Sequence, residues 1–271
     1  MQTPPKAKIT SSVMVWTLTG SFEDRVRTAA RAGMQSLQFV REAAGWDEGE
    51  EKRNVAMIRS YRLEIDLISA VPEWRTQPVS MVNPAHREGL LVEVERRLAR
   101  ARRMEIPRAL LMSGNTIAGL DRSVQWSTLV ENCKRCGALG EKYGITLVVE
   151  PLNTRIDHKG YFLDNCVEGL RLIREAGHPR VRLLFDLYHE QVQSGNVTAS
   201  VEAAAPWVDI FHVADNPGRG EPGTGEMNYA HLYRAIAKTG FAGHIAMEYR
   251  PPADAAGSLI RSVDSMRRAI G

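Results

Sequence analysis

Four side chains that could bind a metal ion recur in the second half of the sequence, each at the end of a short apolar run. They are Glu150, Asp186, His212 and Glu248, with about one strand-and-helix length between neighbours. Three carboxylates held together would repel one another unless a cation neutralised them. Carboxylate oxygens with one imidazole suit Mn²⁺ or Mg²⁺, with Zn²⁺ or Co²⁺ as alternatives. The spacing therefore predicts one divalent-metal site, although a lone acidic residue at a strand end more often bonds to a loop or caps a helix.

The segments that would position these residues alternate between strand and helix patterns along the chain. Short runs rich in Val, Ile and Leu, such as ITLVVE and VRLLFD, are typical of strands buried on both faces of a parallel sheet. Helix patterns lie between them, and several begin at a capping residue and end at a glycine, as in residues 21–33, 164–177 and 228–240. Eight such units predict an α/β fold, a single (β/α)8 TIM barrel domain over residues 1–271.

A doubly wound open sheet is the alternative to the barrel. Such sheets usually carry a G-x-G-x-x-G fingerprint after the first strand. The corresponding stretch here reads VMVWTLTGSFED and lacks that fingerprint, and no linker rich in Pro, Ser or Gly divides the chain. These observations favour the barrel.

The predicted barrel would gather the candidate ligands, because catalytic residues of barrel enzymes lie at the carboxyl ends of the strands. The four ligands would end the fifth to eighth strands and so share one mouth. The first four strands end in residues of other types: Trp16, Gln38, Pro72 with Glu73 and Trp74, and Ser113 with Gly114 and Asn115. Trp16, Trp46 and Trp74 would either wall the pocket or pack in the core.

The overall composition argues against several classes of protein. The net charge is +3, and no run of Lys and Arg is interleaved with aromatic residues, which disfavours a nucleic-acid partner. Three cysteines, an odd number, argue against a secreted disulfide scaffold, and Cys133 and Cys136 fall in a helix pattern with no second cysteine pair. The N-terminus lacks an apolar signal segment, and no apolar run has membrane length. We therefore expect a cytoplasmic protein with no membrane partner.

Longer motifs around the candidate ligands resemble the hydroxypyruvate isomerase family of the xylose isomerase-like TIM barrels, to which sugar isomerases and epimerases belong. The motifs are EPLNTRIDHKGYFLDN, FDLYHEQVQSGN, HVADNPGRGEPGTGEMNY and MEYRP, and the close match covers residues 145–251. The resemblance implies that Glu150, Asp186, His212 and Glu248 bind one divalent metal ion. It also implies that the two glutamates serve as catalytic acid and base.

Two further residues would bind substrate by the same resemblance: His189 would contact a substrate oxygen, and Arg219 would hold the substrate at the rim of the site. Arg219 lies in a glycine- and proline-rich loop after His212, which could be a phosphate cradle or an active-site rim. The glycines do not run directly into a helix N-terminus, as a phosphate site prefers, so the rim is favoured. We expect Pro217 and Pro222 to stiffen this loop and Arg219 to point inward.

Two positions depart from the family pattern. Hydroxypyruvate isomerases in the strict sense tend to carry Gln where His212 stands, and many relatives place a carboxylate near Gln38. These departures leave the exact substrate open more than the class of reaction.

The expected function is that of a metal-dependent isomerase of the aldose–ketose type, or a 3-epimerase, in carbohydrate metabolism. Its substrate would be a small hydroxy-keto acid or a ketose, and the two glutamates would transfer a proton through an enediolate. Three alternatives stay open: a metal-dependent dehydratase (a lyase) of a keto-polyol on the same barrel, a repair nuclease like endonuclease IV, and a sugar-binding relative without turnover. The nuclease would need several more strand-end histidines, and the remaining ones fall mostly in helices or loops. Self-association into a homo-oligomer also stays open.

Overall fold

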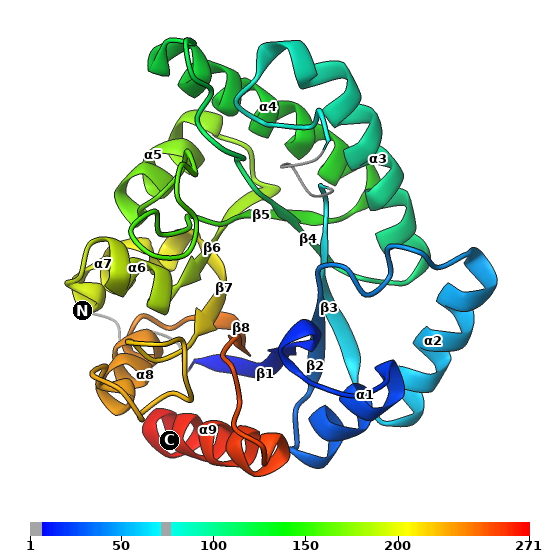
Figure 1. Ribbon diagram of the computed structural model, residues 1–271, viewed down its shortest axis with the longest axis vertical. Coiled ribbons are helices and arrows are strands. Elements are labelled where there is room, and N and C mark those ends of the chain that lie inside the picture. Colours follow the sequence, from blue (N-terminus) through cyan, green and yellow to red (C-terminus); the bar gives the residue numbers. More distant parts are fainter. Residues whose placement is uncertain (1–6, 72–76) are drawn as a thin grey trace. The chain divides into compact units, whose positions relative to one another are not determined.

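The computed structural model describes residues 7–71 and 77–271, and these fall into two compact units. The terminal unit contains the described residues up to Asp66 and all residues from Asn196 onward. The central unit is the described part of Leu67–Gly195. Each unit is built from parallel strands that alternate with helices (Figure 1).

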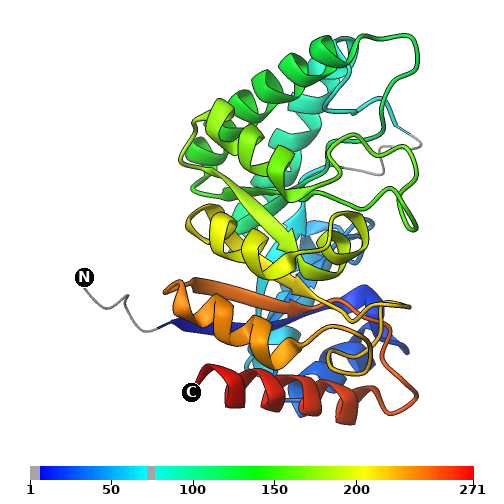
Figure 2. The same cartoon turned by 90° about the vertical axis from the view of Figure 1, so that its left-hand side faces the viewer.

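The terminal unit holds neighbouring parallel strands in the order β7, β8, β1 and β2. These are β1 (Lys8–Met14), β2 (Ser36–Phe39), β7 (Val208–Val213) and β8 (Ala242–Met247). Its helical segments are η1 (Val15–Thr17), α1 (Phe22–Arg31), α2 (Glu48–Ser60), α7 (Val197–Ala204), η3 (Ala205–Trp207), α8 (Tyr229–Lys238) and α9 (Ala255–Ile270). Figure 2 shows α8 and α9 side by side along the outer face of β8. The register places His212 beside Ala246, near the carboxyl ends of β7 and β8.

The central unit continues the pattern from β3 (Glu64–Ser69), whose last residues Ile68 and Ser69 pair with β4. The strands that follow in parallel order are β4 (Arg108–Leu111), β5 (Thr146–Val149) and β6 (Val181–Asp186). Its helical segments are η2 (Pro84–His86), α3 (Arg87–Arg103), α4 (Arg122–Tyr143), α5 (Cys166–Ala176) and α6 (Leu187–Gln193). The helices α3, α4 and α5 follow one another along the outside of β4, β5 and β6 (Figure 1).

The strand order confirms the predicted fold class. Strands β1 to β8 are hydrogen-bonded neighbours in sequence order and form a closed parallel barrel. A helix follows each strand along the chain. The protein is therefore a (β/α)8 TIM barrel. That residues 1–271 make up a single domain stays a prediction.

Local sequence signals explain where the helices begin and end. Ser21 accepts a hydrogen bond from the backbone N–H of Asp24 at the start of α1, and the Asp24 carboxylate accepts one from the backbone of Ser21. Gly144 (φ 71°) ends α4 and Gly177 (φ 58°) ends α5, where the left-handed backbone favours glycine. The predicted helix starts at Ser21 and Asn228 are confirmed.

The strands are largely buried, which explains their nearly continuous apolar sequence. Leu37 of β2 and Ile245 of β8 are 0% exposed, and burial of such side chains contributes about 25 cal/mol per Å² of apolar surface. The exceptions are polar side chains inside the strands. Ser12, Gln38 and Asp66 are also buried, and these residues bear on the candidate site.

The cysteine pair of α4 lies in the interior of the central unit. Cys133 and Cys136 are both buried on α4. Burial raises the pKa of the Cys136 thiol to about 12, so the thiol stays protonated at neutral pH.

Across residues 7–71 and 77–271, no helix is both long and apolar enough to cross a membrane.

Candidate active site

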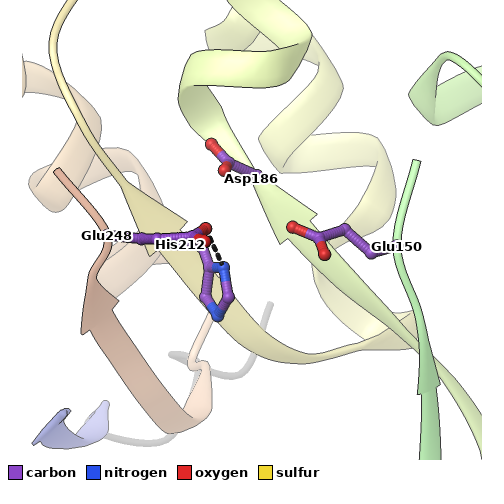
Figure 3. Close-up of side chains that lie close together, drawn as sticks. All are labelled: Glu150, Asp186, His212 and Glu248. Carbon is purple, nitrogen blue, oxygen red and sulfur yellow. Dashed lines mark hydrogen bonds and ion pairs between the residues drawn. The ribbon is translucent and has the colours of Figure 1, made fainter. Parts of the chain in front are cut away.

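The terminal unit contributes one pair of candidate ligands, His212 and Glu248. His212 is the next-to-last residue of β7 and Glu248 directly follows β8, so both stand at the carboxyl ends of neighbouring strands. They are 0% and 6% exposed. His212 Nδ1 lies 2.8 Å from Glu248 Oε2, the contact that Figure 3 marks with a dashed line. The fold of this unit thus brings these two candidate ligands into direct contact.

A chain of buried polar side chains lies behind His212. His212 Nε2 lies 2.7 Å from Gln38 Oε1, and Gln38 Nε2 donates to Asp66 Oδ2 at 2.8 Å. Asp66 Oδ1 in turn accepts a hydrogen bond of 2.6 Å from the Ser12 hydroxyl. Because the amide nitrogen of Gln38 is committed to Asp66, its oxygen faces His212 and accepts the Nε2 proton. The ring nitrogen left to face Glu248 is therefore Nδ1.

Arg219 reaches Glu248 from the loop after β7. Its Nη2 lies 2.9 Å from Glu248 Oε2, and its Nε donates to the Glu248 carbonyl oxygen at 3.3 Å. The backbone at Arg219 is left-handed (φ 57°), and its carbonyl accepts a hydrogen bond of 2.9 Å from the Arg250 N–H. The guanidinium also lies 5.7 Å from the centroid of the Trp16 ring, within cation–π range. Glu248 Oε2 is thus shared by His212 and Arg219.

Asp215 anchors the loop after β7, and sequence reasoning missed it. Its carboxylate accepts hydrogen bonds from the backbone N–H groups of Asn216, Gly223 and Met227, at 2.9, 2.6 and 3.1 Å. The loop also passes close to this carboxylate at Gly225, where a Cβ atom would lie 2.5 Å from Asp215 Oδ1. A side chain at that position would push the loop away from its anchor.

The central unit contributes the other two candidate ligands. Glu150 directly follows β5 and Asp186 is the last residue of β6, and they are 5% and 3% exposed. Asp186 Oδ1 caps α6 by accepting hydrogen bonds from the backbone N–H groups of Tyr188 (2.7 Å) and His189 (3.2 Å). The other oxygen, Oδ2, lies 3.6 Å from His189 Nε2. A helix cap and a metal ligand are therefore compatible at Asp186, because different oxygen atoms can serve them.

Buried hydrogen bonds also fix the backbone at Glu150. The Tyr161 hydroxyl donates to the Glu150 carbonyl oxygen at 3.2 Å and accepts from the Ser113 N–H at 2.8 Å. Burial raises the pKa of Tyr161 well above its ordinary value, so the hydroxyl keeps its proton. Ser113, one of the expected strand-end residues, acts here through its backbone and through its Oγ, which accepts from the Leu163 N–H at 3.2 Å.

A small cavity lies beside Asp186 and His189 in the central unit. Phe185 and Glu190 also line it. Glu190 is 5% exposed and accepts a hydrogen bond of 2.9 Å from the Cys166 N–H at the start of α5. His189, the residue expected to contact substrate, therefore shares a cavity wall with one candidate metal ligand.

The four candidate ligands are chemically suited to a metal ion. Glu150 and Asp186 of the central unit and His212 and Glu248 of the terminal unit are all buried, and each offers one ligand atom. Three carboxylates buried without compensating charge would be costly. Carboxylate oxygens and a single imidazole nitrogen form a donor set that fits Mn²⁺ or Mg²⁺.

The tryptophans expected near the first three strand ends differ in their surroundings. Trp46 makes edge contacts with Phe22 and Phe39, with ring centroids 5.1 and 5.8 Å apart, so it packs inside the terminal unit. Trp16 is 38% exposed and lies close to Arg219. The residues expected at the end of the third strand, Pro72, Glu73 and Trp74, lie outside the described residues.

Two relatives of this chain are isomerases. A hydroxypyruvate isomerase of Escherichia coli (strain K12) is 36% identical over 138 residues, which cover 51% of this chain and 53% of that protein. A 2-oxo-tetronate isomerase of Cupriavidus necator is 33% identical over 149 residues, which cover 55% of this chain and 57% of that protein. These relatives agree with the resemblance that the motifs carry.

Solved structures share the fold over nearly the whole chain. An AP endonuclease, family 2, from Brucella melitensis superposes with a TM-score of 0.84 at 27% identity, covering 95% of this chain and 98% of that one. A D-psicose 3-epimerase from Clostridium cellulolyticum H10 superposes with a TM-score of 0.83, covering 96% and 99%. Because the second structure is only 13% identical in sequence, its similarity shows a shared fold and nothing more.

The family match extends through both halves of the sequence. The family described as "Xylose isomerase-like TIM barrel" matches residues 26–268. This range includes all four candidate ligands and both residues expected to bind substrate. The family expected from the motifs is confirmed: the chain belongs to the xylose isomerase-like TIM barrels.

Proposed function

We propose that this protein is a divalent-metal-dependent isomerase or epimerase of a small hydroxy-keto acid or ketose. One observation carries the proposal: four buried ligand-type side chains, Glu150, Asp186, His212 and Glu248, stand at the ends of four consecutive strands, β5 to β8. In barrels of this kind the chemistry is located at those strand ends. Relatives named as isomerases support the reaction class.

The same four residues would hold the cation. Mn²⁺ or Mg²⁺ suits the mostly oxygen donor set best, with Zn²⁺ or Co²⁺ as alternatives. When bound, such an ion supplies positive charge that stabilises the oxygens of an enediolate. For the residues themselves, the ion would offset the repulsion among three buried carboxylates.

Glu150 and Glu248 are the proposed acid and base. They come from different strands, β5 and β8, and could act on different sides of a substrate. One would take the proton from the carbon next to the substrate carbonyl and the other would return a proton, each contributing about 10²–10⁴ in rate. Return to the neighbouring carbon gives isomerisation, and return to the same carbon from the opposite face gives epimerisation.

Arg219 and His189 are the proposed substrate contacts. The Arg219 guanidinium has five N–H donors in a planar fork, so it can bind a substrate carboxylate while it keeps its contact with Glu248. This favours a keto acid, whose carboxylate gives Arg219 a matched partner. His189 would donate a hydrogen bond to a substrate oxygen from the cavity wall that it shares with Asp186.

The structural likeness to an AP endonuclease makes a nuclease the second candidate function. A three-metal nuclease site would require a larger set of ligand residues. Among residues 7–71 and 77–271, the candidate ligands number two in each unit, too few for such a site. This favours a single ion and the isomerase.

Proton exchange in D₂O, followed by NMR, tests the proposed reaction. The protein would be incubated with Mg²⁺ and with hydroxypyruvate or a panel of ketoses and keto acids. We expect deuterium to enter the carbon next to the carbonyl and EDTA to stop this, and the product distinguishes an isomer from an epimer. Loss of water from a keto-polyol would identify a dehydratase instead. Absence of exchange with every compound would contradict proton transfer and favour a binding protein.

A further inference from the structure

A buried hydrogen-bond network inside the central unit surrounds His189. His189 lies in the first turn of α6 and is 2% exposed, and Asn153, three residues after Glu150, is 0% exposed. Asn153 Nδ2 lies 2.6 Å from His189 Nδ1, and the Asn153 backbone nitrogen lies 3.4 Å from the same ring atom. Both of these contacts bring an N–H group of Asn153 to His189 Nδ1.

The orientation of the Asn153 amide follows from its other contacts. Its Oδ1 accepts hydrogen bonds from the backbone N–H groups of Ile156 (3.0 Å) and Asp157 (3.1 Å). An NH₂ group in that place would face two donors, so the oxygen must lie there. The two hydrogens of Nδ2 then point to Asp157 Oδ2, at 2.7 Å, and to His189 Nδ1. Asp157 Oδ2 also accepts from the Tyr188 hydroxyl at 2.9 Å, which ties the network to α6.

We propose that Asn153 is a positioning residue that fixes the tautomer of His189, with the ring proton on Nε2. A ring nitrogen that receives two N–H groups must act as an acceptor and carries no hydrogen. The proton is then on Nε2, which lies 3.6 Å from Asp186 Oδ2, beyond an ordinary hydrogen bond. His189 therefore presents an N–H donor on the side of the ring that faces a candidate metal ligand and the cavity.

The role of this donor toward substrate rests on the proposed function. An N–H fixed before substrate arrives can stabilise negative charge that develops on a substrate oxygen. The opposite tautomer would aim a lone pair at the same oxygen and repel it. Asn153 would thus select substrates with a hydroxyl or carbonyl oxygen at this position and would act through His189 alone, without touching them.

The tautomer is measured by ¹⁵N NMR on full-length protein labelled at histidine, in Mg²⁺ buffer. His189→Gln identifies the His189 signals by their absence. We expect a pyridine-type shift for Nδ1 and a pyrrole-type shift for Nε2. In Asn153→Asp, a carboxylate replaces the donor, so we expect the proton to appear on Nδ1. A pyrrole-type Nδ1 in the unaltered protein, or an unchanged His189 spectrum in Asn153→Asp, would overturn the assignment.

Kinetics with the substrate found by proton exchange complete the test. We expect Asn153→Asp to lower kcat about 10- to 100-fold with little change in KM, because the lost donor acts on developing charge. Asn228→Asp is the matched control, since Asn228 caps α8 through its oxygen and aspartate can do the same. An unchanged kcat despite a moved proton would overturn the role toward substrate. If no compound turns over, the proposed function fails while the NMR result still decides the tautomer.

Discussion

The two buried histidines of the candidate site are held by side-chain amides in opposite ways. In the terminal unit, the Gln38 oxygen lies 2.7 Å from His212 Nε2, so the ring turns Nδ1 toward Glu248. In the central unit, the Asn153 nitrogen lies 2.6 Å from His189 Nδ1, so the ring turns Nε2 toward Asp186. The orientation of one amide thus decides whether an imidazole offers a lone pair or an N–H.

The supports behind the two amides also differ. Gln38 is held by Asp66 of β3, which is bonded to Ser12 of β1, so that network lies between strands. Asn153 lies in the loop after β5 and is held by backbone N–H groups of Ile156 and Asp157. A ligand supported by strands is rigidly placed, whereas a donor supported by a loop follows any change in that loop.

Removing the proposed acid–base group from each unit in turn should cause the largest loss of activity. Glu150→Gln and Glu248→Gln keep the shape of the side chain and remove its ability to take a proton. We expect each to lower turnover by about 10²–10⁴-fold, measured as deuterium exchange and as kcat. Circular dichroism should show an unchanged fold. Full activity in either variant would contradict the mechanism with one glutamate from each unit.

The comparison between the histidines predicts that only His212 supports metal binding. Mn²⁺ at 100 times its dissociation constant should stabilise the unaltered protein by about 2.7 kcal/mol, measured as a shift in thermal unfolding that EDTA reverses. His212→Ala should lose most of this shift. His189→Ala is the matched control, which should keep the shift and lose turnover. Loss of the shift in both variants would contradict the expectation that His212 supports metal binding and His189 does not.

Substitution of Gln38, whose amide accepts from His212, should have a smaller effect on metal binding. Gln38→Leu removes the acceptor that orients the ring, and we expect metal affinity to fall about 10- to 100-fold, as for other residues that support a ligand. Gln35→Leu makes the same change at the exposed, amino-terminal side of β2. Calorimetric titration of Mn²⁺ into both variants tests this expectation. Equal affinities would show that β7 alone orients His212.

Sequence reasoning predicted the features that depend on local patterns. The strand ends at Glu150, Asp186, His212 and Glu248 followed from apolar runs, and the start of α1 at Ser21 followed from capping chemistry. Both signals are contained in a few neighbouring residues. The fold class followed from repeating them eight times.

The supporting networks depend on contacts between residues far apart in the sequence. Ser12 and Asp66 meet because of the fold, and no short motif specifies that pair. A signal was nevertheless present, since Asp66 is an acidic residue inside the apolar strand EIDLIS, where an unpartnered carboxylate would be costly. Asn153 stood in a recognised motif, but its orientation depends on the turn at Ile156 and Asp157.

A substitution in the loop that carries Arg219 should have the smallest effect, a modest loss of stability. Glu221 in this loop accepts hydrogen bonds from Arg261 Nη2 and from the Ser258 hydroxyl, both at 2.7 Å, which tie the loop to α9. The Arg261 guanidinium, with help from Ser258, holds the pKa of Glu221 below its ordinary value. A carboxyl group whose pKa is lowered by folding adds stability above its unfolded pKa and loses this contribution as the pH falls through the folded value.

Glu221→Gln should therefore lower the free energy of unfolding by about 0.5–1 kcal/mol at pH 7, a small value because Arg261 is largely exposed. The difference from the unaltered protein should shrink as the pH falls below the ordinary pKa of a glutamate, as measured by urea unfolding at pH 7 and in acid. Glu202→Gln, at an exposed position on α7, is the control and should show no such difference. If Glu221→Gln kept its full deficit in acid, the contact would be stabilising by packing rather than by charge. The Arg219 loop would then be held, like the Asn153 loop, by hydrogen bonds that do not depend on ionisation of this carboxylate.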